Sequence, residues 1–268
     1  MIEKQIPEFT ETVFFNKKNK YALLIPLFNE GERYFEQVEK MKNNNIFSIV
    51  DVIVCDAGST DGTTDISFLK KNGHRALLTR KGKGRYSTDL RMGYFWALQQ
   101  EYEGIISVDG NNKDDTCAVP NFIQKLNEGY DYIQGSRYVK GGKAINTPFI
   151  RHWALKLINE PIMTLCAGKH LSDTTNGFRA YSKKFLEDDR VLPFREIFWG
   201  YELIYYLPIR ACRLGFKTIE IPVTRAYPKG EVPSKVGGIK GNIYQLSILH
   251  HCIWNHYLPG REYKLEKR

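Results

Sequence analysis

The sequence predicts an α/β fold in which a central, mostly parallel sheet is flanked by helices. Short apolar runs bounded by turn residues alternate with segments of helical period along most of the chain. Several of these runs end in acidic or polar residues, as strands do where they face a ligand crevice. Alternation of strand and helix favours parallel pairing, because parallel strands need a crossover between them. The 268 residues are enough for one large domain of this kind.

The first half of the chain contains four predicted strands and three predicted helices. The runs YALLIPLF and DVIVCD have the length and composition of buried strands. Segment 87–101 carries apolar residues at helical spacing, which predicts a long helix packed on the sheet. The predicted strands are 21–28, 51–56, 75–79 and 104–109, and the predicted helices are 30–41, a segment from about residue 63, and 87–101.

The second half is less regular. It continues the alternation but ends in a loop rich in Gly, Pro and Lys at 228–241, which we expect to be exposed and mobile. The tail 242–258 has an apolar stripe at helical spacing, which would pack on the core or lie in a membrane interface. The other predicted elements are helices at 120–129, 149–166 and 201–215, strands at 131–136 and 217–223, and an irregular segment at 173–182.

Composition and charge narrow the classes of protein that fit. The net charge of +9 suggests an anionic partner, either nucleic acid, a phosphorylated small molecule or an anionic membrane surface. Composition alone slightly favours the simpler alternative, a soluble protein with a lysine-rich exterior. No module that interleaves basic and aromatic residues appears, so we do not expect nucleic acid to be the partner. The five cysteines are scattered and form no CxxC pair, which argues against a zinc site and fits a reducing cytosol. No apolar stretch is long enough to span a membrane.

Polar motifs follow three of the predicted strands. They read PLFNE at 26–30, CDAGSTDGT at 55–63 and VDGNNKDD at 108–115. Each alone could be a turn or a helix cap. The carboxyl ends of parallel strands meet at one edge of a sheet, so the three motifs together predict a ligand site there.

In combination these motifs resemble the family-2 glycosyltransferases of the GT-A fold. The second half narrows the resemblance to the polyprenyl (dolichol)-phosphate mannose synthase branch, through QGSRYVKGG, DTTNGFRAYS, GYELIYY, LGFKTIEIPV and a loop ending in SK. The resemblance covers roughly residues 20–240. It implies a GT-A domain over 1–241, with a nucleotide-sugar half at about 20–115 and an acceptor half at about 130–241. Residues 242–268 would form a C-terminal helix and tail that could lie at a membrane.

The resemblance assigns the donor side of the site. By analogy, Pro26, Phe28, Glu30 and Asp56 would hold the base and ribose of the nucleotide. The family's DxD motif, which binds the diphosphate through Mg²⁺ or Mn²⁺, corresponds here to Asp109, Gly110 and Asn111. An Asn oxygen can coordinate a hard cation but lacks charge, and Lys113 stands where the branch has a metal-binding Gln. Asp114 and Asp115 could compensate, and a turn without metal is the alternative.

The resemblance also assigns the acceptor side. Arg137 and Arg151 match two phosphate-binding arginines of the branch in motif and in their spacing of fourteen residues, and guanidinium groups suit phosphate oxygens. Lys229 and Lys235 match a basic pair in a loop that grips the acceptor phosphate, although a Lys replaces an Arg at 229. Asp173 is the candidate base or acceptor-orienting carboxylate, with Glu202 as a second candidate. Each could instead be a helix cap or part of a buried ion pair. Arg179 would anchor Asp173 or contact phosphate.

These assignments lead to one expected function and its alternatives. The protein is expected to transfer a sugar, with inversion, from a nucleotide-diphosphate sugar to a polyprenyl phosphate at the cytoplasmic face of a membrane, as a peripheral protein. One alternative is a polysaccharide-building transferase that extends a lipid-linked saccharide. An alternative of another class is a nucleotide-sugar-binding protein with impaired catalysis, which the change to Asn111 and Lys113 would favour.

Overall fold

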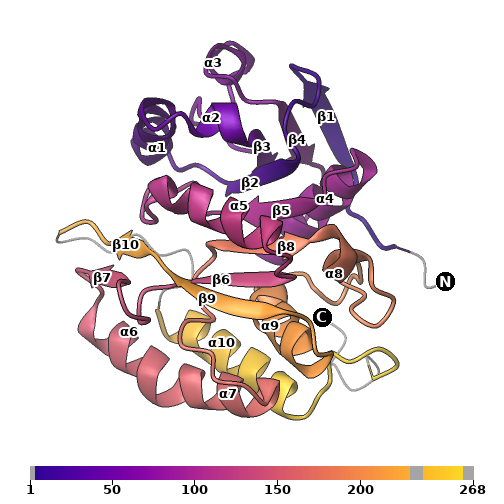
Figure 1. Ribbon diagram of the computed structural model, residues 1–268, viewed down its shortest axis with the longest axis vertical. Helices are drawn as coiled ribbons and strands as arrows, with labels where there is room; N and C mark the ends of the chain where they lie inside the picture. The colour runs from indigo at the N-terminus through magenta and orange to yellow at the C-terminus, as the bar shows by residue number, and fades with distance from the viewer. Residues whose placement is uncertain (1–3, 230–237, 262–268) are drawn as a thin grey trace.

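The computed structural model describes residues 4–229 and 238–261. An eight-stranded sheet forms its centre, with strand order β1-β4-β3-β2-β5-β8-β6-β9 (Figure 1). Strands β2 to β5 pair in parallel, and β6 pairs in parallel with β9. Strands β1 and β8 run antiparallel to their neighbours. The predicted fold class, a mostly parallel sheet flanked by helices, is confirmed.

The first half follows the predicted alternation closely. Its strands are β2 (Tyr21–Leu27), β3 (Asp51–Asp56), β4 (Ala76–Arg80) and β5 (Gly104–Ser107). Its helices are α1 (Glu32–Asn43), α2 (Ile46–Ile49), α3 (Ile66–Lys71) and α4 (Tyr86–Gln99). The sequence did not predict β1 (Phe9–Val13) or α2. Strand β1 lies at the edge of the sheet beside β4 and is mostly exposed, so it lacks an apolar run.

The second half adds the elements that surround the other end of the sheet. Its strands are β6 (Tyr132–Ser136), β7 (Lys143–Ile145), β8 (Arg179–Ser182), β9 (Thr218–Pro222) and β10 (Thr224–Ala226). Its α-helices are α5 (Val119–Asn127), α6 (Phe149–Ala154), α7 (Glu160–Ala167), α8 (Lys183–Glu187), α9 (Glu202–Arg213) and α10 (Gly238–Ile253). A short 3-10 turn, Thr116–Ala118, precedes α5, and a π-helical segment, Leu155–Asn159, joins α6 to α7.

Two predictions for the second half were wrong in part. Segment 173–182 was expected to be irregular, but its last four residues form β8, which lies inside the sheet between β5 and β6. Strand β8 escaped prediction because it is short and begins with a buried arginine. The loop predicted over 228–241 was wrong at its end, because α10 begins at Gly238. Glycine is tolerated at a helix start, where the first amides have no helical partner.

Strand residues alternate between two hydrophobic cores. Leu24, Ile53 and Ile105 face one core, which α4, α7, α9 and α10 cover. Leu23 and Val52 face the other core, which α1, α2, α3 and α5 cover. This period of two is that of a strand buried on both faces. The small parallel sheet of β7 and β10 stands beside the main sheet (Figure 1). Within the described ranges, no helix has the length and apolar character needed to cross a membrane.

Candidate active site

The carboxyl ends of the parallel strands bring the predicted site residues to one edge of the sheet. Strand β3 ends at Asp56, Asp109 follows β5 by two residues, and Arg137 directly follows β6. Strand β8 runs the opposite way, so the segment that contains Asp173 enters the sheet at this same edge. Strand β9 also ends here and leads into β10. The topology therefore assembles a site from segments that are far apart in the sequence.

The loops after β2 and β3 are joined at this edge. Asn29, in a left-handed conformation with φ of 47°, accepts a hydrogen bond from the amide of Thr60 at 2.8 Å. Asn29 also donates its own amide to Ser59 Oγ at 3.1 Å. The buried Asp56 carboxylate accepts from the Ser59 amide at 2.8 Å, which fixes the turn after β3. These bonds hold the two loops assigned to the nucleotide in one arrangement.

The remaining residues assigned to the nucleotide lie on or after β2. Pro26 is buried within the strand and pairs with Cys55 of β3. Phe28 is exposed, and the Glu30 carboxylate forms an ion pair of 2.7 Å with Arg33. The structure thus brings Pro26, Phe28, Glu30 and Asp56 to one pair of neighbouring strand ends.

Asp109 lies at the centre of the edge and has three polar neighbours. The Tyr86 hydroxyl donates to Asp109 Oδ1 at 2.9 Å, and Arg225 Nη2 lies 3.2 Å from Oδ2. The Asn111 amide nitrogen lies 3.4 Å from the same Oδ2. Burial raises the pKa of Asp109, but the Arg225 charge and the Tyr86 hydrogen bond outweigh it and hold this pKa below its usual value. Asp109 is therefore an anion at neutral pH.

Arg225 is the main site residue that the sequence interpretation missed. Its guanidinium group contacts Asp114 through Nη1 and Asp109 through Nη2, so it joins the two carboxylates. The amide of Ala226 donates to the Lys113 carbonyl at 2.8 Å, which fixes the backbone beside the motif. The available signal was the stretch TRAY, directly after the predicted strand 217–223.

Asp114 is the second carboxylate of this centre. Burial raises its pKa to about 6, although the Arg225 charge opposes this. Its Oδ1 atom is buried without a hydrogen-bond partner among the described residues. A buried carboxylate oxygen without a donor is costly, which marks a place that a cation or another donor would stabilise.

Arg137 and Asp173 form a buried pair. Arg137 donates through Nε and Nη2 to the two Asp173 oxygens at 2.7 and 2.6 Å, and its backbone amide adds a bond of 3.0 Å. Both side chains are almost fully buried. The sequence placed both residues in the site but did not predict that they pair. In this arrangement Arg137 orients Asp173, and both Asp173 oxygens accept hydrogen bonds.

A basic cluster, which we define as Lys113, Arg151 and Arg225, surrounds the ring of Tyr227. The Lys113 nitrogen lies 5.2 Å from the ring centre, and the guanidinium carbons of Arg151 and Arg225 each lie 5.8 Å from it. Burial raises the pKa of Tyr227, but the charges of Arg225, Arg151 and Arg137 more than offset this and lower it below its usual value. The cluster brings positive charge next to Asp109 and is suited to an anion.

The structure places Arg179 and Glu202 in the framework around the site. Arg179 is buried and donates to the carbonyl oxygens of Asn176 and Ile204, each at 2.7 Å, and of Thr174. It therefore ties segment 173–178 to α9. Glu202 is buried and accepts from the Gly200 amide at 2.5 Å and from the Tyr244 hydroxyl of α10 at 2.7 Å.

Of the two lysines assigned to the acceptor loop, the described part of the chain includes one. Lys229 is exposed beyond β10. Lys235 lies outside the described residues.

The donor atoms at this edge fit a divalent cation that substrate helps to hold. Asp109 and Asp114 supply carboxylate oxygen atoms, the ligand type that Mg²⁺ and Mn²⁺ prefer. Asn111 would add its side-chain oxygen, which accepts from the Lys113 amide at 3.2 Å in this structure. No cluster of three or more Asp, Glu, His or Cys side chains within 4–229 and 238–261 could hold a metal alone. Mg²⁺ is commonly bound by one or two carboxylates together with substrate phosphates, and the present set matches that pattern.

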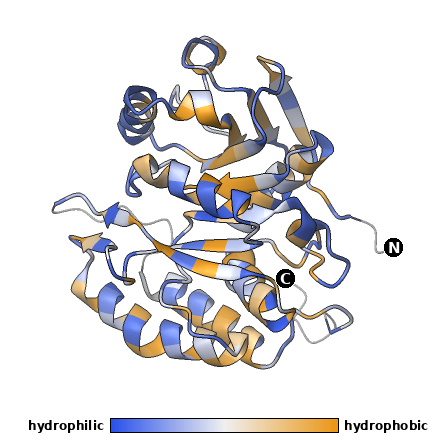
Figure 2. Cartoon of the chain, viewed as in Figure 1, coloured by the Kyte–Doolittle hydropathy of each residue, from blue (hydrophilic) through white to orange (hydrophobic). Residues whose placement is uncertain are grey.

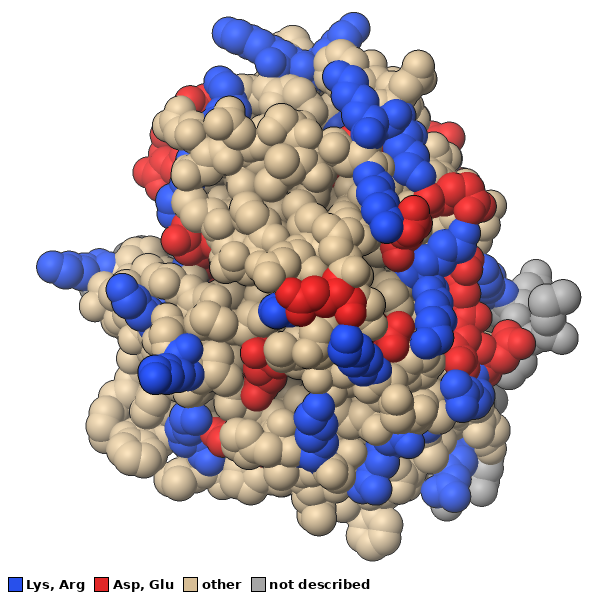
Figure 3. All heavy atoms as spheres, in the orientation of Figure 1, with Lys and Arg blue, Asp and Glu red and all other residues tan. Residues whose placement is uncertain are grey.

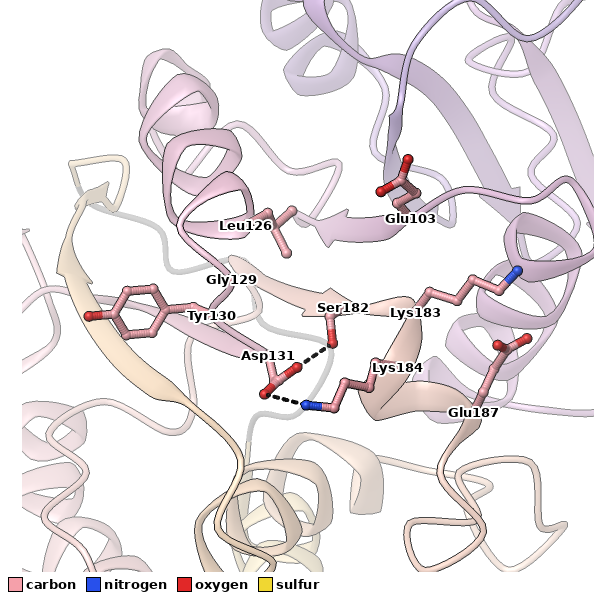
Figure 4. Close-up of a pocket in the computed structure, with 9 residues that line it drawn as sticks. All are labelled: Glu103, Leu126, Gly129, Tyr130, Asp131, Ser182, Lys183, Lys184 and Glu187. Carbon is pink, nitrogen blue, oxygen red and sulfur yellow. Dashed lines mark hydrogen bonds and ion pairs between the residues drawn. The ribbon is translucent and has the colours of Figure 1, made fainter.

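A shallow pocket at the opposite end of the strands has a different character (Figure 4). Asp131 in this pocket accepts from Ser182 at 2.9 Å and pairs with Lys184 at 3.8 Å. Lys183 pairs with Glu101 nearby. Because these charges are paired with one another near the surface, the pocket presents no group aimed at a ligand.

The arrangement of sheet, helices and polar strand ends is that of the GT-A fold. Glucosyl-3-phosphoglycerate synthase of Mycobacterium tuberculosis, solved with Mn²⁺, UDP-glucose and phosphoglyceric acid, shares this fold. It superposes with a TM-score of 0.60 at 16% identity over 87% of this chain and 79% of that chain. The model of the family Glycosyl transferase family 2 matches residues 22–190, more than half of the chain. The chain therefore belongs to glycosyltransferase family 2.

Two relatives are more similar to this chain in sequence than the solved structure is. Undecaprenyl-phosphate mannosyltransferase of Micrococcus luteus is 26% identical over 223 residues, which cover 81% of this chain and 88% of that protein. Polyprenol monophosphomannose synthase of Mycolicibacterium smegmatis is 28% identical over 205 residues, covering 75% of this chain and 76% of that protein. The resemblance to the polyprenyl-phosphate mannose synthase branch is thus confirmed.

Proposed function

We propose that this protein transfers a sugar from a nucleotide-diphosphate sugar to a polyprenyl phosphate at a membrane surface. The observation that carries the proposal is the basic cluster of Lys113, Arg151 and Arg225 beside Asp109. This arrangement provides for two phosphate-bearing groups, a donor diphosphate near Asp109 and an acceptor phosphate near Arg151. The names of the two relatives above, both of which refer to polyprenyl phosphates or their mannosylated products, support this choice of acceptor.

The donor would bind across the ends of β2, β3 and β5. We assign Pro26, Phe28, Glu30 and Asp56 to the nucleoside, because the hydrogen bonds around Asn29 hold their two loops together. Asp109 and Asn111, with Asp114 beside them, would hold Mg²⁺ or Mn²⁺. When bound, the ion supplies positive charge that stabilises the leaving diphosphate.

Because the proposed acceptor is a phosphate, the site needs positive charge to bind it more than it needs a general base to deprotonate it. A phosphate monoester has a second pKa of about 6, so at neutral pH it is already an anionic nucleophile. Cations are needed to bind it close to the donor diphosphate, which repels it. The Asp173 carboxylate, held by Arg137, would orient groups near the sugar and need not remove a proton.

Inversion follows from a single displacement. A phosphate oxygen attacks the anomeric carbon from the face opposite the diphosphate, the new carbon–oxygen bond forms, and the bond to the diphosphate oxygen breaks with both electrons. The nucleoside diphosphate leaves with its extra negative charge. Arg225 would remain as a fixed positive charge near Asp109 during this step.

Binding of each substrate can be measured without turnover. UDP, GDP, dTDP and CDP, each with and without Mn²⁺, would be compared by thermal denaturation, and one of them should raise Tm more strongly with metal. Farnesyl phosphate should also raise Tm, whereas farnesol should not. The variant Arg151→Ala should lose the farnesyl phosphate effect and keep the nucleotide effect, and the surface variant Arg190→Ala should keep both. No Tm shift with any nucleotide or with farnesyl phosphate would overturn the proposal.

A further inference from the structure

The helix pair α6–α7 has an apolar stripe on the side that faces solvent. Phe149, Trp153, Leu157, Pro161 and Leu165 recur at every fourth residue, and all five are exposed. Phe149, Leu157 and Leu165 are 76%, 67% and 71% exposed, respectively. The stripe extends about 24 Å at the helical rise of 1.5 Å per residue. We call these five residues, together with Ile150 and Ile158, the outer stripe.

The outer stripe is unusual because the same helix pair also has an inner face. Met163 and Ala167 are buried in the core, and Asn159 is buried beside them. A surface helix normally exposes polar residues opposite its buried face. Here the exposed face carries Ile150, which is 82% exposed, and the further apolar residues of the stripe. In Figure 2, hydrophobic residues recur along both helices on the outside of the molecule. An exposed apolar surface of this extent marks a binding surface.

Helix α10 belongs to the same helical layer and has exposed apolar residues of its own. It packs against α7 and α9. Its buried residues Ile248, Leu249 and Cys252 join the core. Its exposed apolar residues are Ile243, Leu246 and Ile253, and the exposed Trp254 directly follows the helix.

The net positive charge of the segments that contain α6, α7 and α10 indicates which kind of partner would bind them. Residues 139–170 contain five Lys and Arg but only one acidic residue, Glu160. Residues 238–261 contain Lys240 and Arg261 and no acidic residue. In the space-filling view, the lower part of the molecule, where α6 and α7 lie, is mainly uncharged with separate Lys and Arg side chains (Figure 3). Two copies of this chain meeting through such a surface would bring like charges together, whereas an anionic bilayer would attract it.

The outer stripe is continuous with the active site. Arg151 belongs to α6 and reaches the ring of Tyr227 in the basic cluster. Phe149 and Ile150, one turn or less away on the same helix, are exposed. A lipid whose phosphate lies at Arg151 therefore has an apolar surface beside it for its hydrocarbon chain.

We propose that the outer stripe of α6–α7, with the exposed apolar residues of α10, inserts into the head-group region of an anionic lipid bilayer. This inference rests on the proposed function, because it takes the acceptor to be a lipid. Helices of this kind lie in the plane of the interface with their apolar face about 5–10 Å deep. Trp153 and Trp254 are residues that prefer this depth, and the neighbouring lysines would contact lipid phosphates. Docking in this way brings Arg151 to the level of the lipid phosphate.

Vesicle flotation tests the docking surface directly. The wild-type protein would be mixed with phosphatidylcholine vesicles, with and without phosphatidylglycerol. The stripe variant combines Trp153→Ser, Leu157→Ser and Leu165→Ser, so that Phe149 and Ile150 beside Arg151 are unchanged. The control variant combines Val13→Ser, Ile49→Ser and Ile66→Ser, which are exposed apolar residues on other elements. Thermal denaturation shows that each variant is folded.

We expect the wild-type and control proteins to float with the anionic vesicles. The stripe variant should bind these vesicles at least about tenfold more weakly. Binding of farnesyl phosphate in detergent-free buffer should be the same in all three proteins, because the basic cluster is intact. Equal flotation of the stripe variant and the wild type would overturn the inference. A second result would also overturn it. If the wild type does not float but forms a dimer in light scattering, and the stripe variant is a monomer, then a second copy of the chain covers the stripe. If farnesyl phosphate fails to bind while flotation behaves as expected, the proposed acceptor is wrong and the docking surface stands.

Discussion

At the scale of single residues, Arg225 connects the parts of the site. It contacts Asp109 and Asp114, and it lies against the ring of Tyr227 together with Arg151 and Lys113. Asp109 and Asp114 lie 116 and 111 positions from Arg225 along the chain, and Arg151 belongs to α6. A buried cation between two carboxylates offsets the repulsion that the carboxylates would otherwise exert on each other.

Removing the Arg225 charge should destabilise the fold. In Arg225→Gln, two buried carboxylates lose their shared partner, and the free energy of unfolding should fall by about 3–5 kcal/mol. Arg190 forms an exposed ion pair with Asp188, so Arg190→Gln should cost at most about 1 kcal/mol. Urea denaturation of both variants measures the difference. Equal stability of the two variants would mean that Arg225 is not a structural centre of the site.

Sequence patterns could predict which residues gather at the site but not how they pair. Asp56 and Asp109 were found because they follow apolar strands, and Arg137 and Arg151 because their motif and spacing are recognisable. The bond between Arg137 and Asp173 joins residues 36 positions apart, and Arg225 joins Asp109 from 116 positions away. Such distant pairs depend on the order of strands in the sheet, which local patterns do not encode.

At the scale of secondary-structure elements, His74 joins two helices to the sheet. It lies just before β4 and is fully buried. One ring nitrogen lies 2.8 Å from the hydroxyl of Tyr34 in α1, and the other lies 3.0 Å from the carbonyl oxygen of Leu69 in α3. Burial lowers the pKa of His74 to about 4, despite the favourable contact with the Leu69 carbonyl. The folded protein therefore holds this residue neutral.

The lowered pKa of His74 predicts a pH dependence of stability. The unfolded chain binds a proton at this residue below about pH 6.5, whereas the folded protein does not until about pH 4. Stability is thus lost as the pH falls through this window, by about 3 kcal/mol in total. The variant His74→Gln should show a weaker loss between pH 7 and pH 4.5 in urea denaturation. His170 is exposed, and His170→Gln should keep the wild-type slope. If His74→Gln loses as much stability between pH 7 and pH 4.5 as the wild type does, this explanation is contradicted.

The elements that could be predicted differ physically from those that could not. Strands β2, β3 and β5 are buried on both faces, so their apolar runs are unmistakable. Strands β1, β7 and β10 are short and largely exposed or half-buried, and they carry no such run. The helix at 149–166 was predicted from its apolar residues, but periodicity cannot tell whether an apolar face is buried or exposed. Only the packing shows that its outer stripe faces solvent.

At the scale of the whole molecule, the proposed donor and acceptor sides lie along one edge of the sheet. The loops after β2 and β3 form the proposed nucleotide side, and the basic cluster with α6 forms the proposed acceptor side. The helical layer of α6, α7 and α10 lies on the acceptor side of the molecule (Figure 1). A bilayer against that layer would leave the nucleotide side open to solution. The predicted division into a nucleotide-sugar half at about 20–115 and an acceptor half at about 130–241 remains a prediction.

Transfer of label to lipid is the most direct measurement of the central claim. The protein would be incubated with Mn²⁺, undecaprenyl phosphate in vesicles and radiolabelled nucleotide sugars, one at a time, and the organic phase would be counted. We predict a labelled, acid-labile sugar phosphate lipid with one donor, and a loss of at least about 100-fold in Asp109→Asn, which removes the charge near the diphosphate. Asp65→Asn, a change at a helix cap where Asn serves equally well, should leave transfer unchanged. No label in the organic phase with any of the donors would contradict the claim.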